Sequence, residues 1–435
     1  MTSKRILITG LSTYWGGRLA HALEQDPAVE AVIGVDKRPP KVALERTEFV
    51  RVEDHHSLIR RIVQAAEIDT VVDTRLVSDS IVTSPKLAHE NNVIGTMNVL
   101  AACGGPDSSV KKVVFKSSAR YYGSEQDDPA FFKEAMQRPK PARTPIERDI
   151  VEAESSVREF SERNPDTVVT TLRFANGLGP SVRTSYTRYL DLPVIPTILG
   201  FDPRHQFLHE DDFAGVLEHA VRHDLDGVFN AAADGVLVLS EVVDLLGKVS
   251  APVLPPFATG LILPLLRRAK LPISADMLQH LRFGRGLDNR KLKATGYRYR
   301  YTTREAVLKL REHQRLAPLT RGAHESYRYE QEVEEFLRRS PSVRRVARPE
   351  RRANLAAGAS NAEPSPATPA PPAGYADLQA REVIALLGSL EADALTALRD
   401  HETGHAARKT VLAAIDAHLA RQRAVLEASG RASGT

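Results

Sequence analysis

The sequence predicts an α/β protein built on a doubly wound parallel sheet, with a smaller α/β lobe attached to it. Short apolar runs alternate with segments of helical periodicity, which is the pattern of a parallel sheet covered by helices on both faces. The first apolar run ends in a glycine-rich turn that leads into a helix. After Asn176 the pattern loosens and becomes rich in Pro and Tyr, which indicates the smaller lobe.

The elements follow one another regularly along the chain. Apolar runs predict strands at 4–10, 31–36, 49–52, 70–73, 112–115 and 167–172, and helical spacing predicts helices at 17–25, 57–66 and 84–102. We expect a first domain over 1–320, with its lobe mainly at 176–230 and 250–300.

The chain beyond residue 337 has a different composition. Arginines concentrate in 338–352, and residues 361–374 are rich in Pro, Ala and Ser, so 337–374 is predicted to be a disordered linker. Apolar residues return at helical spacing over 375–427, which predicts a C-terminal helical hairpin. Its apolar face needs burial, so we expect it to bind a partner protein or a second copy of the chain.

Composition excludes several classes of protein. A net charge of +4 over 435 residues makes no strong case for nucleic-acid binding. The single cysteine, Cys103, excludes a disulfide framework and fits a reducing cytoplasm, and no cluster has the spacing of metal ligands. The N-terminus lacks the apolar core of a signal peptide, so we expect a cytoplasmic protein. The apolar segment 261–266 is too short to span a bilayer, and packing in the lobe is favoured over contact with a membrane surface.

The turn after the first strand carries Gly10, Thr13, Tyr14, Trp15 and Gly16. Glycines in such a turn let the backbone approach a pyrophosphate at the helix N-terminus, so the sequence predicts a Rossmann nucleotide site. Thr13 takes the place of a middle glycine, and its side chain crowds the approach of the phosphate.

Asp36 ends the second strand, where a carboxylate can accept hydrogen bonds from an adenosine ribose. The same carboxylate would repel a 2′-phosphate, so NAD is favoured over NADP. Lys37 and Arg38 come next and weaken this preference, because either cation can pair with such a phosphate.

Further motifs occur in a fixed order. Residues 89–96 contain E-x-N-V-x-G-T, residues 113–123 contain S-S-x-x-x-Y-G, residues 172–180 contain R-x-x-N-x-x-G-P, and residues 207–212 contain H-x-D-D. Over residues 4–310 the chain therefore resembles the extended short-chain dehydrogenase/reductase family, in its NAD-dependent epimerase/dehydratase branch. It is similar to proteins described as UDP-glucose 4-epimerases.

The resemblance implies a role for each matching residue. Ser118 takes the position of the catalytic serine, and Asn92 helps to organise the active site. The motif after the third strand would contact adenine through Glu53 and Asp54, and the substrate cleft would contain Arg173, Asn176 and His209. Enzymes of this kind bind a nucleotide sugar, and the resemblance suggests a homodimer formed through helices of the Rossmann domain.

The catalytic Tyr/Lys pair of the family is absent. In these enzymes the two residues lie at i and i+4 of one helix, and the lysine lowers the pKa of the phenol so that Tyr can exchange a proton as hydride moves. Ile146 and Ile150 occupy these positions, and none of the eleven tyrosines is followed by Lys at i+4.

Arg75 is a second departure, because it stands in a segment that is small and apolar in the family. Its guanidinium either lies near the ribose or nicotinamide or turns into solvent. Substitutes for the missing tyrosine are Tyr121 and Tyr122, which follow Ser118, and Lys116, which precedes it. Glu147, Arg148 and Asp149 on the helix that lacks the pair are further candidates, although a carboxylate is a poor proton donor to an alkoxide.

Two functions from different classes are consistent with these observations. One is an atypical NAD-dependent epimerase/dehydratase or oxidoreductase that acts on a nucleotide sugar or a related substrate. Ser118 and Asn92 favour it. The other is a catalytically inactive dinucleotide-binding scaffold or sensor that acts through the C-terminal helical module. The missing Tyr/Lys pair and the added module favour it.

Overall fold

The computed structural model describes residues 3–52, 56–79, 83–105, 108–138, 140–254 and 273–316, and parts of 395–420. The chain divides into two compact units, Met1–Phe336 and Leu337–Thr435. The linker predicted over 337–374 and the apolar segment 261–266 lie outside the described residues, as does much of the predicted hairpin. Within the second unit, buried apolar side chains contact one another at Leu395, Leu398, Val411 and Ile415.

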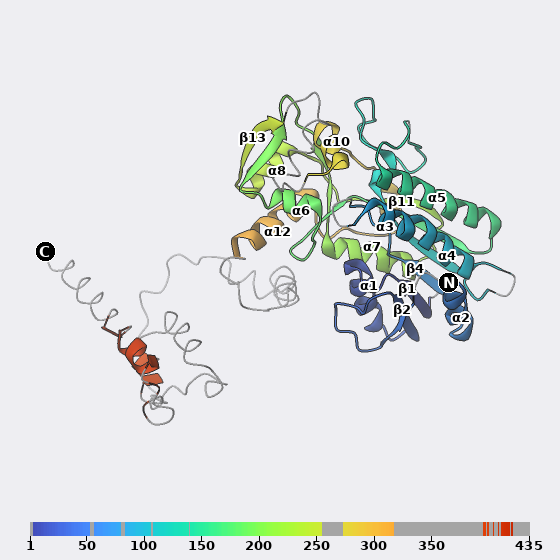
Figure 1. The fold of residues 1–435 in the computed structure, drawn as a ribbon, viewed down its shortest axis with the longest axis horizontal. Coiled ribbons are helices and arrows are strands. Elements are labelled where there is room, and N and C mark those ends of the chain that lie inside the picture. The colour runs from blue at the N-terminus through green and yellow to red at the C-terminus, as the bar shows by residue number, and fades with distance from the viewer. Residues whose placement is uncertain are drawn as a thin grey trace, which may run out of the picture. The chain divides into compact units, whose positions relative to one another are not determined.

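A seven-stranded parallel sheet forms the centre of the first unit (Figure 1). Its strand order is β11-β6-β5-β4-β1-β2-β3, and every neighbouring pair is parallel. The strands are β1 (Arg5–Thr9), β2 (Ala31–Asp36), β3 (Thr47–Arg51), β4 (Thr70–Asp73), β5 (Lys112–Ser118), β6 (Val168–Phe174) and β11 (Gly227–Ala231). The order runs outward from β1 in both directions, so the carboxyl ends of β1 and β4 meet at a topological switch point. This confirms the predicted Rossmann-like α/β fold.

Helices cover both faces of this sheet. One face packs against α2 (His56–Ala65), α4 (Gly95–Cys103) and α5 (Pro145–Arg163), and the other against α1 (Tyr14–Glu24) and α7 (Glu210–Arg222). Along β5, Val113 and Phe115 belong to the first layer and Val114 to the second. Side chains alternate along a strand, so Lys116 and Ser118 point to the same face as Val114.

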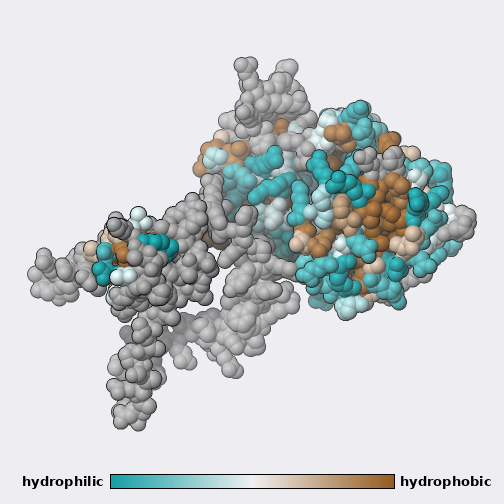
Figure 2. All heavy atoms as spheres, turned by 60° about the horizontal axis from the view of Figure 1, so that its bottom comes forward, coloured by the Kyte–Doolittle hydropathy of each residue, from teal (hydrophilic) through white to brown (hydrophobic). Residues whose placement is uncertain are grey.

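The face of the molecule drawn in Figure 2 carries apolar patches among hydrophilic residues. Three exposed apolar side chains occur on the segment that contains α3 (Pro85–His89), the π-helical turn η1 (Glu90–Ile94) and α4. Leu87 is 57% exposed, Ile94 46% and Met97 51%. The helix predicted over 84–102 is therefore three consecutive helical segments with one exposed apolar edge.

The first helix begins earlier than predicted. It starts at Tyr14, not at Gly17, because the Thr13 hydroxyl accepts a hydrogen bond from the Gly16 N–H and caps the helix. Tyr14, Trp15 and Gly16 therefore belong to the first turn of α1 and not to the loop before it.

The smaller lobe has a core of its own, which coincides with the predicted bounds only in part. Within the predicted range 176–230, α7 packs on the main sheet and β11 is one of its strands. Two helices outside both predicted ranges, α8 (Leu239–Leu246) and α12 (Thr303–Leu316), supply Val242 and Leu310 to the lobe core. The lobe pairs β7 with β10, β8 with β13 and β9 with β12. Its elements are β7 (Asn176–Leu178), α6 (Ser185–Leu190), β8 (Val194–Ile198), β9 (Arg204–His205), β10 (Phe207–His209), β12 (Leu237–Val238), α8 (Leu239–Leu246), β13 (Val249–Leu254), α10 (Ala275–Phe283), α11 (Arg290–Ala294) and α12 (Thr303–Leu316).

Candidate functional site

The glycine turn needs two of its glycines for steric reasons. Gly10 has φ +83°, a backbone conformation that favours glycine, and a Cβ there would lie 2.6 Å from Arg75 Cγ. A Cβ on Gly16 would lie 2.3 Å from the carbonyl oxygen of Gly10. The absence of a Cβ at both positions therefore allows the close packing of the backbone where β1 passes into α1.

Thr13 closes the same turn with its side chain. Its hydroxyl donates to Gly10 O at 2.7 Å and accepts from Gly16 N at 3.0 Å. It also lies 3.2 Å from the hydroxyl of Thr74. The Thr13 hydroxyl is thus hydrogen-bonded within the turn. This limits how far the side chain crowds the approach of a phosphate.

A cleft of about 380 Å³ opens beside this turn, and we call it the glycine-turn cleft. It is lined by Thr9, Ser12, Thr13, Val35, Asp36, Lys37, Arg38, Val52, Ile59, Arg75, Val77, Thr83, Leu87 and Asn91. The Asp36 carboxylate accepts hydrogen bonds from Ser12 N at 2.9 Å and Lys37 N at 2.6 Å. Glu53 and Asp54, predicted to contact adenine, lie outside the described residues.

Tyr14 and Trp15 do not line the glycine-turn cleft. The Tyr14 hydroxyl accepts from Arg18 at 2.8 Å, and burial raises the pKa of Tyr14 well above its usual value. Trp15 stacks on Phe213 with ring centroids 3.6 Å apart. Their side chains pack against α1 and α7, while their backbone lies in the first turn of α1, so their contact with the cofactor stays a prediction that concerns the backbone alone.

Arg75 turns inward, so its predicted alternative in solvent is wrong. Its side chain is 12% exposed and hydrogen-bonds the Asp73 carboxylate through both Nε and Nη2. Burial raises the pKa of Asp73, but the neighbouring Arg75 outweighs it and holds that pKa below its usual value. Arg75 therefore reaches the glycine-turn cleft as half of a buried ion pair.

Asn92 fixes the loop that follows β4. Its buried amide accepts from Val77 N at 2.7 Å and donates to Val77 O at 2.7 Å. Both functions of the amide are therefore used on the backbone of one residue. This geometry gives Asn92 a positioning role.

Ser118 ends β5 and lines a second, smaller cavity of about 70 Å³, which we call the Ser118 pocket. Its lining residues are Trp15, Ser78, Asp79, Lys116, Ser117, Ser118, Arg120, Phe174, Ala175, Asn176, Gly177, Thr184, Ser185, Tyr186 and Phe213. The Ser118 oxygen accepts from Arg120 N at 3.3 Å. Ser118 thus lies where the main sheet meets the lobe, and Asn176 lies in the same pocket.

The positions of the missing Tyr/Lys pair lie on α5. Thr144 caps this helix and Pro145 begins it. Ile146 is 3% exposed and Ile150 is fully buried. Apolar side chains at these two positions supply neither a proton donor nor a cation.

Tyr121 and Tyr122 are buried away from the Ser118 pocket, which corrects their place as substitutes. The Tyr122 hydroxyl donates to Asn230 Oδ1 at 2.8 Å, and burial raises the pKa of Tyr122 to about 12. The guanidinium of Arg173 lies 3.5 Å from the Tyr121 ring centroid and binds Glu154 through Nε and Nη2. Arg173 is therefore part of a buried ion pair and not of the predicted substrate cleft.

His209 is also buried and does not line the Ser118 pocket, so its contact with substrate stays a prediction. Its Nδ1 accepts from Asp211 N at 3.3 Å at the start of α7, and its ring lies 4.2 Å from that of Tyr301. Asn176, by contrast, lines the pocket and places its amide nitrogen 3.4 Å from His280 Nε2.

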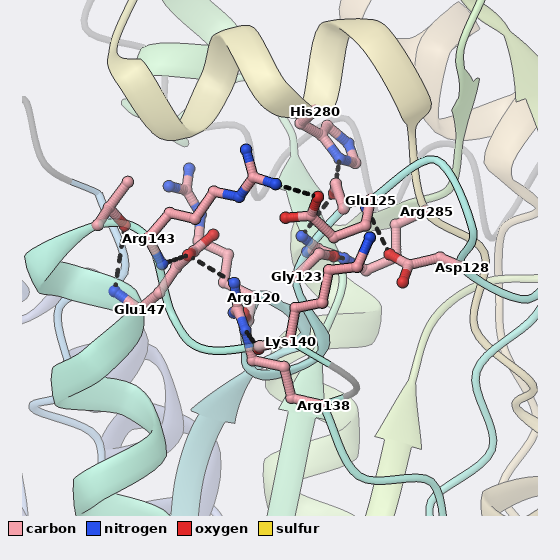
Figure 3. A network of polar contacts seen from close by, with 12 residues as sticks. Arg120, Gly123, Glu125, Asp128, Arg138, Lys140, Arg143, Glu147, His280 and Arg285 are labelled. Carbon is pink, nitrogen blue, oxygen red and sulfur yellow. Dashed lines mark hydrogen bonds and ion pairs between the residues drawn. The ribbon is translucent and has the colours of Figure 1, made fainter.

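A basic network lies beside the Ser118 pocket (Figure 3). Glu147 accepts from Arg138 at 2.8 Å and from the Arg143 N–H at 3.1 Å. Arg285 donates to Gly123 O, and burial together with the nearby Arg120 lowers the pKa of Arg285 to about 9. The guanidinium groups of Arg120 and Arg285 therefore lie near each other away from solvent, whereas Arg138 and Arg143 are paired with carboxylates.

Sequence reasoning missed Arg120, Tyr186, His280 and Arg285, which line a small cavity next to the Ser118 pocket. Arg120, Asn176 and Tyr186 line both cavities. These residues come from distant parts of the chain and match no motif. The motif after β5 was the one sequence feature near these residues, and it indicated Tyr121 and Tyr122 and not Arg120.

The described residues cover 3–52, 56–79, 83–105, 108–138, 140–254, 273–316 and parts of 395–420. Within those ranges no helix has the length and apolar character needed to cross a bilayer. Among the same residues no group of three or more His, Cys, Asp or Glu side chains is arranged to hold a metal ion.

Related sequences cover most of the chain. The model of the NAD dependent epimerase/dehydratase family matches residues 6–232. An uncharacterized protein of Mycobacterium tuberculosis is 37% identical over 311 residues, which covers 70% of this chain and 82% of that relative. An uncharacterized protein of Mycobacterium bovis matches with the same identity and coverage.

Solved structures of similar fold include nucleotide-sugar enzymes. The UDP-glucose 4-epimerase of Thermotoga maritima with UDP-glucose is 19% identical and has a TM-score of 0.55 over 72% of this chain and 99% of that chain. The Bordetella bronchiseptica enzyme WbmG in complex with NAD is 20% identical, with a TM-score of 0.54 over 75% and 98%. At such identities the likeness shows the fold alone. The family model, which spans more than half of the chain, and the mycobacterial relatives show that the chain belongs to the NAD dependent epimerase/dehydratase family, among the extended short-chain dehydrogenases/reductases.

Proposed function

We propose that this chain binds NAD in the glycine-turn cleft and oxidises and reduces a carbon of a nucleotide sugar seated in the Ser118 pocket. It would be an epimerase, dehydratase or oxidoreductase that works without the Tyr/Lys pair. One observation carries the proposal: the loop after β4 lines both cavities. Val77 lines the cleft, while Ser78 and Asp79 line the pocket. Hydride transfer needs donor and acceptor carbons within about 3.5 Å, so adjoining sites are required.

The residues of the glycine-turn cleft fit a dinucleotide. Gly10 and Gly16 carry no side chain at the N-terminus of α1, where a pyrophosphate gains from the backbone N–H groups and the helix dipole. Asp36 stands at the end of β2 and suits the ribose hydroxyls of NAD. Lys37 and Arg38 line the same cleft and are the residues that would tolerate NADP.

The Ser118 pocket fits a polar, anionic substrate. Ser118 and Asn176 offer hydrogen-bonding groups to a sugar hydroxyl, and Arg120 adds positive charge. A guanidinium suits a diphosphate because its donors match phosphate oxygens in pairs. UDP-glucose accompanies NAD in the solved structure of MoeE5, which has the same fold at 19% identity.

Released nucleotide tests the cofactor first. The purified full chain is denatured, any nucleotide is identified by chromatography, and the refolded or apo protein is titrated with NAD and NADP. We expect NAD to be released or to bind more tightly than NADP. Failure of both dinucleotides to bind would contradict the proposal. UDP-glucose is then added with NAD, and C4 epimerisation or net reduction of the nicotinamide is measured.

A scaffold without turnover is the second candidate, and Ile146 and Ile150 on α5 favour it. The two functions differ in one measurement. The enzyme converts a nucleotide sugar, and Ser118→Ala lowers that rate while leaving NAD affinity unchanged. A scaffold binds NAD and converts none of a panel of UDP- and dTDP-sugars, with or without Ser118.

A homodimer is the proposed assembly of the first unit. The exposed side chains Ile94 and Met97 lie on the η1–α4 segment, beyond the residues that line the glycine-turn cleft. Sedimentation equilibrium tests this assembly. We expect the full chain to sediment as a dimer and Met97→Glu as a monomer, whereas a monomeric wild-type chain would contradict the proposal.

A further inference from the structure

Lys116 places a buried amine in the Ser118 pocket. It lies on β5 two residues before Ser118, so both side chains project from the same face of the strand. Both residues line the pocket, and Lys116 is 7% exposed. Its Nζ donates to the carbonyl oxygen of Leu76 at 2.6 Å.

A second buried lysine on the same strand shows what a purely structural role looks like. Lys112 is 2% exposed, and its Nζ binds Val221 O at 2.9 Å, His223 O at 3.1 Å and the Asp224 carboxylate at 2.8 Å. Three acceptors thus occupy its three N–H groups. Among the described residues, Lys116 Nζ binds one acceptor, Leu76 O, which leaves the amine able to meet a group in the pocket.

The charged groups around Lys116 come from several elements. Asp73 on β4 is the carboxylate that acts on it, and this carboxylate is already paired with Arg75. Asp79 and Arg120 line the same pocket, with opposite charges. On the helices of that face, Asp211 of α7 pairs with Arg18 of α1 at 2.6 Å.

Burial lowers the pKa of Lys116 to about 8, and Asp73 opposes this shift only in part. An amine with that pKa is neutral in roughly one molecule in ten at pH 7, against fewer than about one in a thousand for an ordinary lysine. A neutral amine can accept a proton, and an ammonium can return it, close to physiological pH.

We propose that Lys116 is the general base and acid of this site and takes the place of the missing Tyr/Lys pair. The proposal rests on the proposed function. Oxidised NAD, when bound, accepts the hydride that leaves the substrate carbon. As that C–H bond breaks, the hydroxyl on the same carbon loses its proton to the neutral Lys116 Nζ, and the C–O bond becomes a carbonyl. Ser118 donates a hydrogen bond to that oxygen, and the reverse step returns the proton from the Lys116 ammonium.

Cyanate tests the amine without any turnover. It carbamylates neutral amines, and mass spectrometry of the full chain after digestion gives the rate at Lys116 as a function of pH. We expect a midpoint at about pH 8, well below the ~10.4 of an ordinary lysine. No modification of Lys116, or a midpoint near that of an ordinary lysine, would overturn the proposal.

Three variants separate a proton-transfer role from a structural one, with UDP-glucose and NAD as the probes. Lys116→Met is expected to lose at least about 100-fold in turnover while it keeps NAD affinity. Lys116→Arg keeps a donor for Leu76 O but cannot release its proton, so it should be as inactive. Lys112→Met should lose stability and keep the turnover of its folded fraction.

The pH profile gives the decisive outcome. Wild-type oxidation should rise with pH through about 8, and the residual rates of both Lys116 variants should lack this limb. An active Lys116→Arg variant would show that the residue only holds the Leu76 carbonyl, and would overturn the proposal. If the wild-type chain converts no nucleotide sugar, the proposed function fails, while the cyanate titration still decides the state of the amine.

Discussion

The Arg75 guanidinium binds the Asp73 carboxylate through two hydrogen bonds, from Nε to Oδ1 at 3.0 Å and from Nη2 to Oδ2 at 2.9 Å. Asp73 is 2% exposed, so this pair is buried at the base of the glycine-turn cleft. Asp73→Asn removes the charge that compensates for the burial of the guanidinium. We expect the free energy of unfolding to fall by about 3 kcal/mol, measured by urea denaturation.

An exposed pair serves as the control for that variant. Arg290 is 78% exposed in its side chain and binds Asp288. Because water screens such a pair, Arg290→Ala should change the free energy of unfolding by less than about 1 kcal/mol. Equal effects of the two substitutions would contradict the importance of the buried pair.

Asp36 should determine the preference of the glycine-turn cleft for NAD over NADP. Asp36→Ala removes the carboxylate that would bind the ribose hydroxyls, and we expect NAD affinity to fall at least about tenfold, a loss of ~1.4 kcal/mol. Affinity for NADP should fall less or rise, because the repulsion of the 2′-phosphate disappears while Lys37 and Arg38 stay in place. Calorimetric titration with both dinucleotides measures this, and an unchanged NAD/NADP ratio would contradict it.

Gly16 should tolerate no side chain, whereas its neighbour Gly17 should. A Cβ on Gly16 would lie 2.3 Å from Gly10 O, a backbone atom, while one on Gly17 would meet a methyl group of Val42 at 3.2 Å. Gly16→Ala is therefore expected to weaken NAD binding by more than about tenfold, since the turn must shift. Gly17→Ala should bind NAD normally, because a methyl group can move and alanine favours the helix. Similar NAD affinities for the two variants would contradict the conclusion that the turn has no room for a Cβ at Gly16.

Two buried histidines predict a loss of stability in acid. Burial lowers the pKa of His205 to about 3 and that of His280 well below its usual value. Below about pH 6.5 these histidines bind protons in the unfolded chain but stay neutral in the folded chain. Their contribution to the free energy of unfolding is therefore fully present above that pH and is lost as the pH falls. At pH about 5 each histidine should cost ~2 kcal/mol of unfolding free energy.

Urea denaturation at pH about 7 and about 5 measures this loss. His205→Gln keeps a donor and an acceptor for Tyr186 but does not titrate, so its stability should fall with about half the wild-type slope. A wild-type stability that stays level over this range would show that the two rings are protonated in the folded chain.

Six of the seven strands of the main sheet could be predicted from short runs of apolar and β-branched residues, but β11 lies in the range that was assigned to the lobe and was missed. The start of α1 could not be predicted, because Gly16 and Gly17 suggest a turn and the side chain of Thr13 decides the cap. The division of 84–102 into three segments was equally hidden, since a π-helical turn leaves the apolar spacing almost unchanged.

The residues of the candidate site likewise include some that could be predicted from the sequence and some that could not. Motifs located Ser118, Asn92 and Asp36, because their positions at strand ends or on one helix fix where their backbone lies. A motif does not state which way a side chain points, and so Arg173 and His209 were assigned to the cleft but are buried. The pocket residues from the lobe are brought to Ser118 by a fold whose contacts span many residues, which no local pattern records.

The hydrogen bonds of Asn92 to both backbone groups of Val77 have a thermodynamic consequence. They hold the short segment that faces the glycine-turn cleft at one residue and the Ser118 pocket at the next two. A ligand that moved or stiffened this segment from one cavity would change the affinity of the other cavity for its own ligand. The factor by which each ligand altered the affinity of the other would then be the same in both directions.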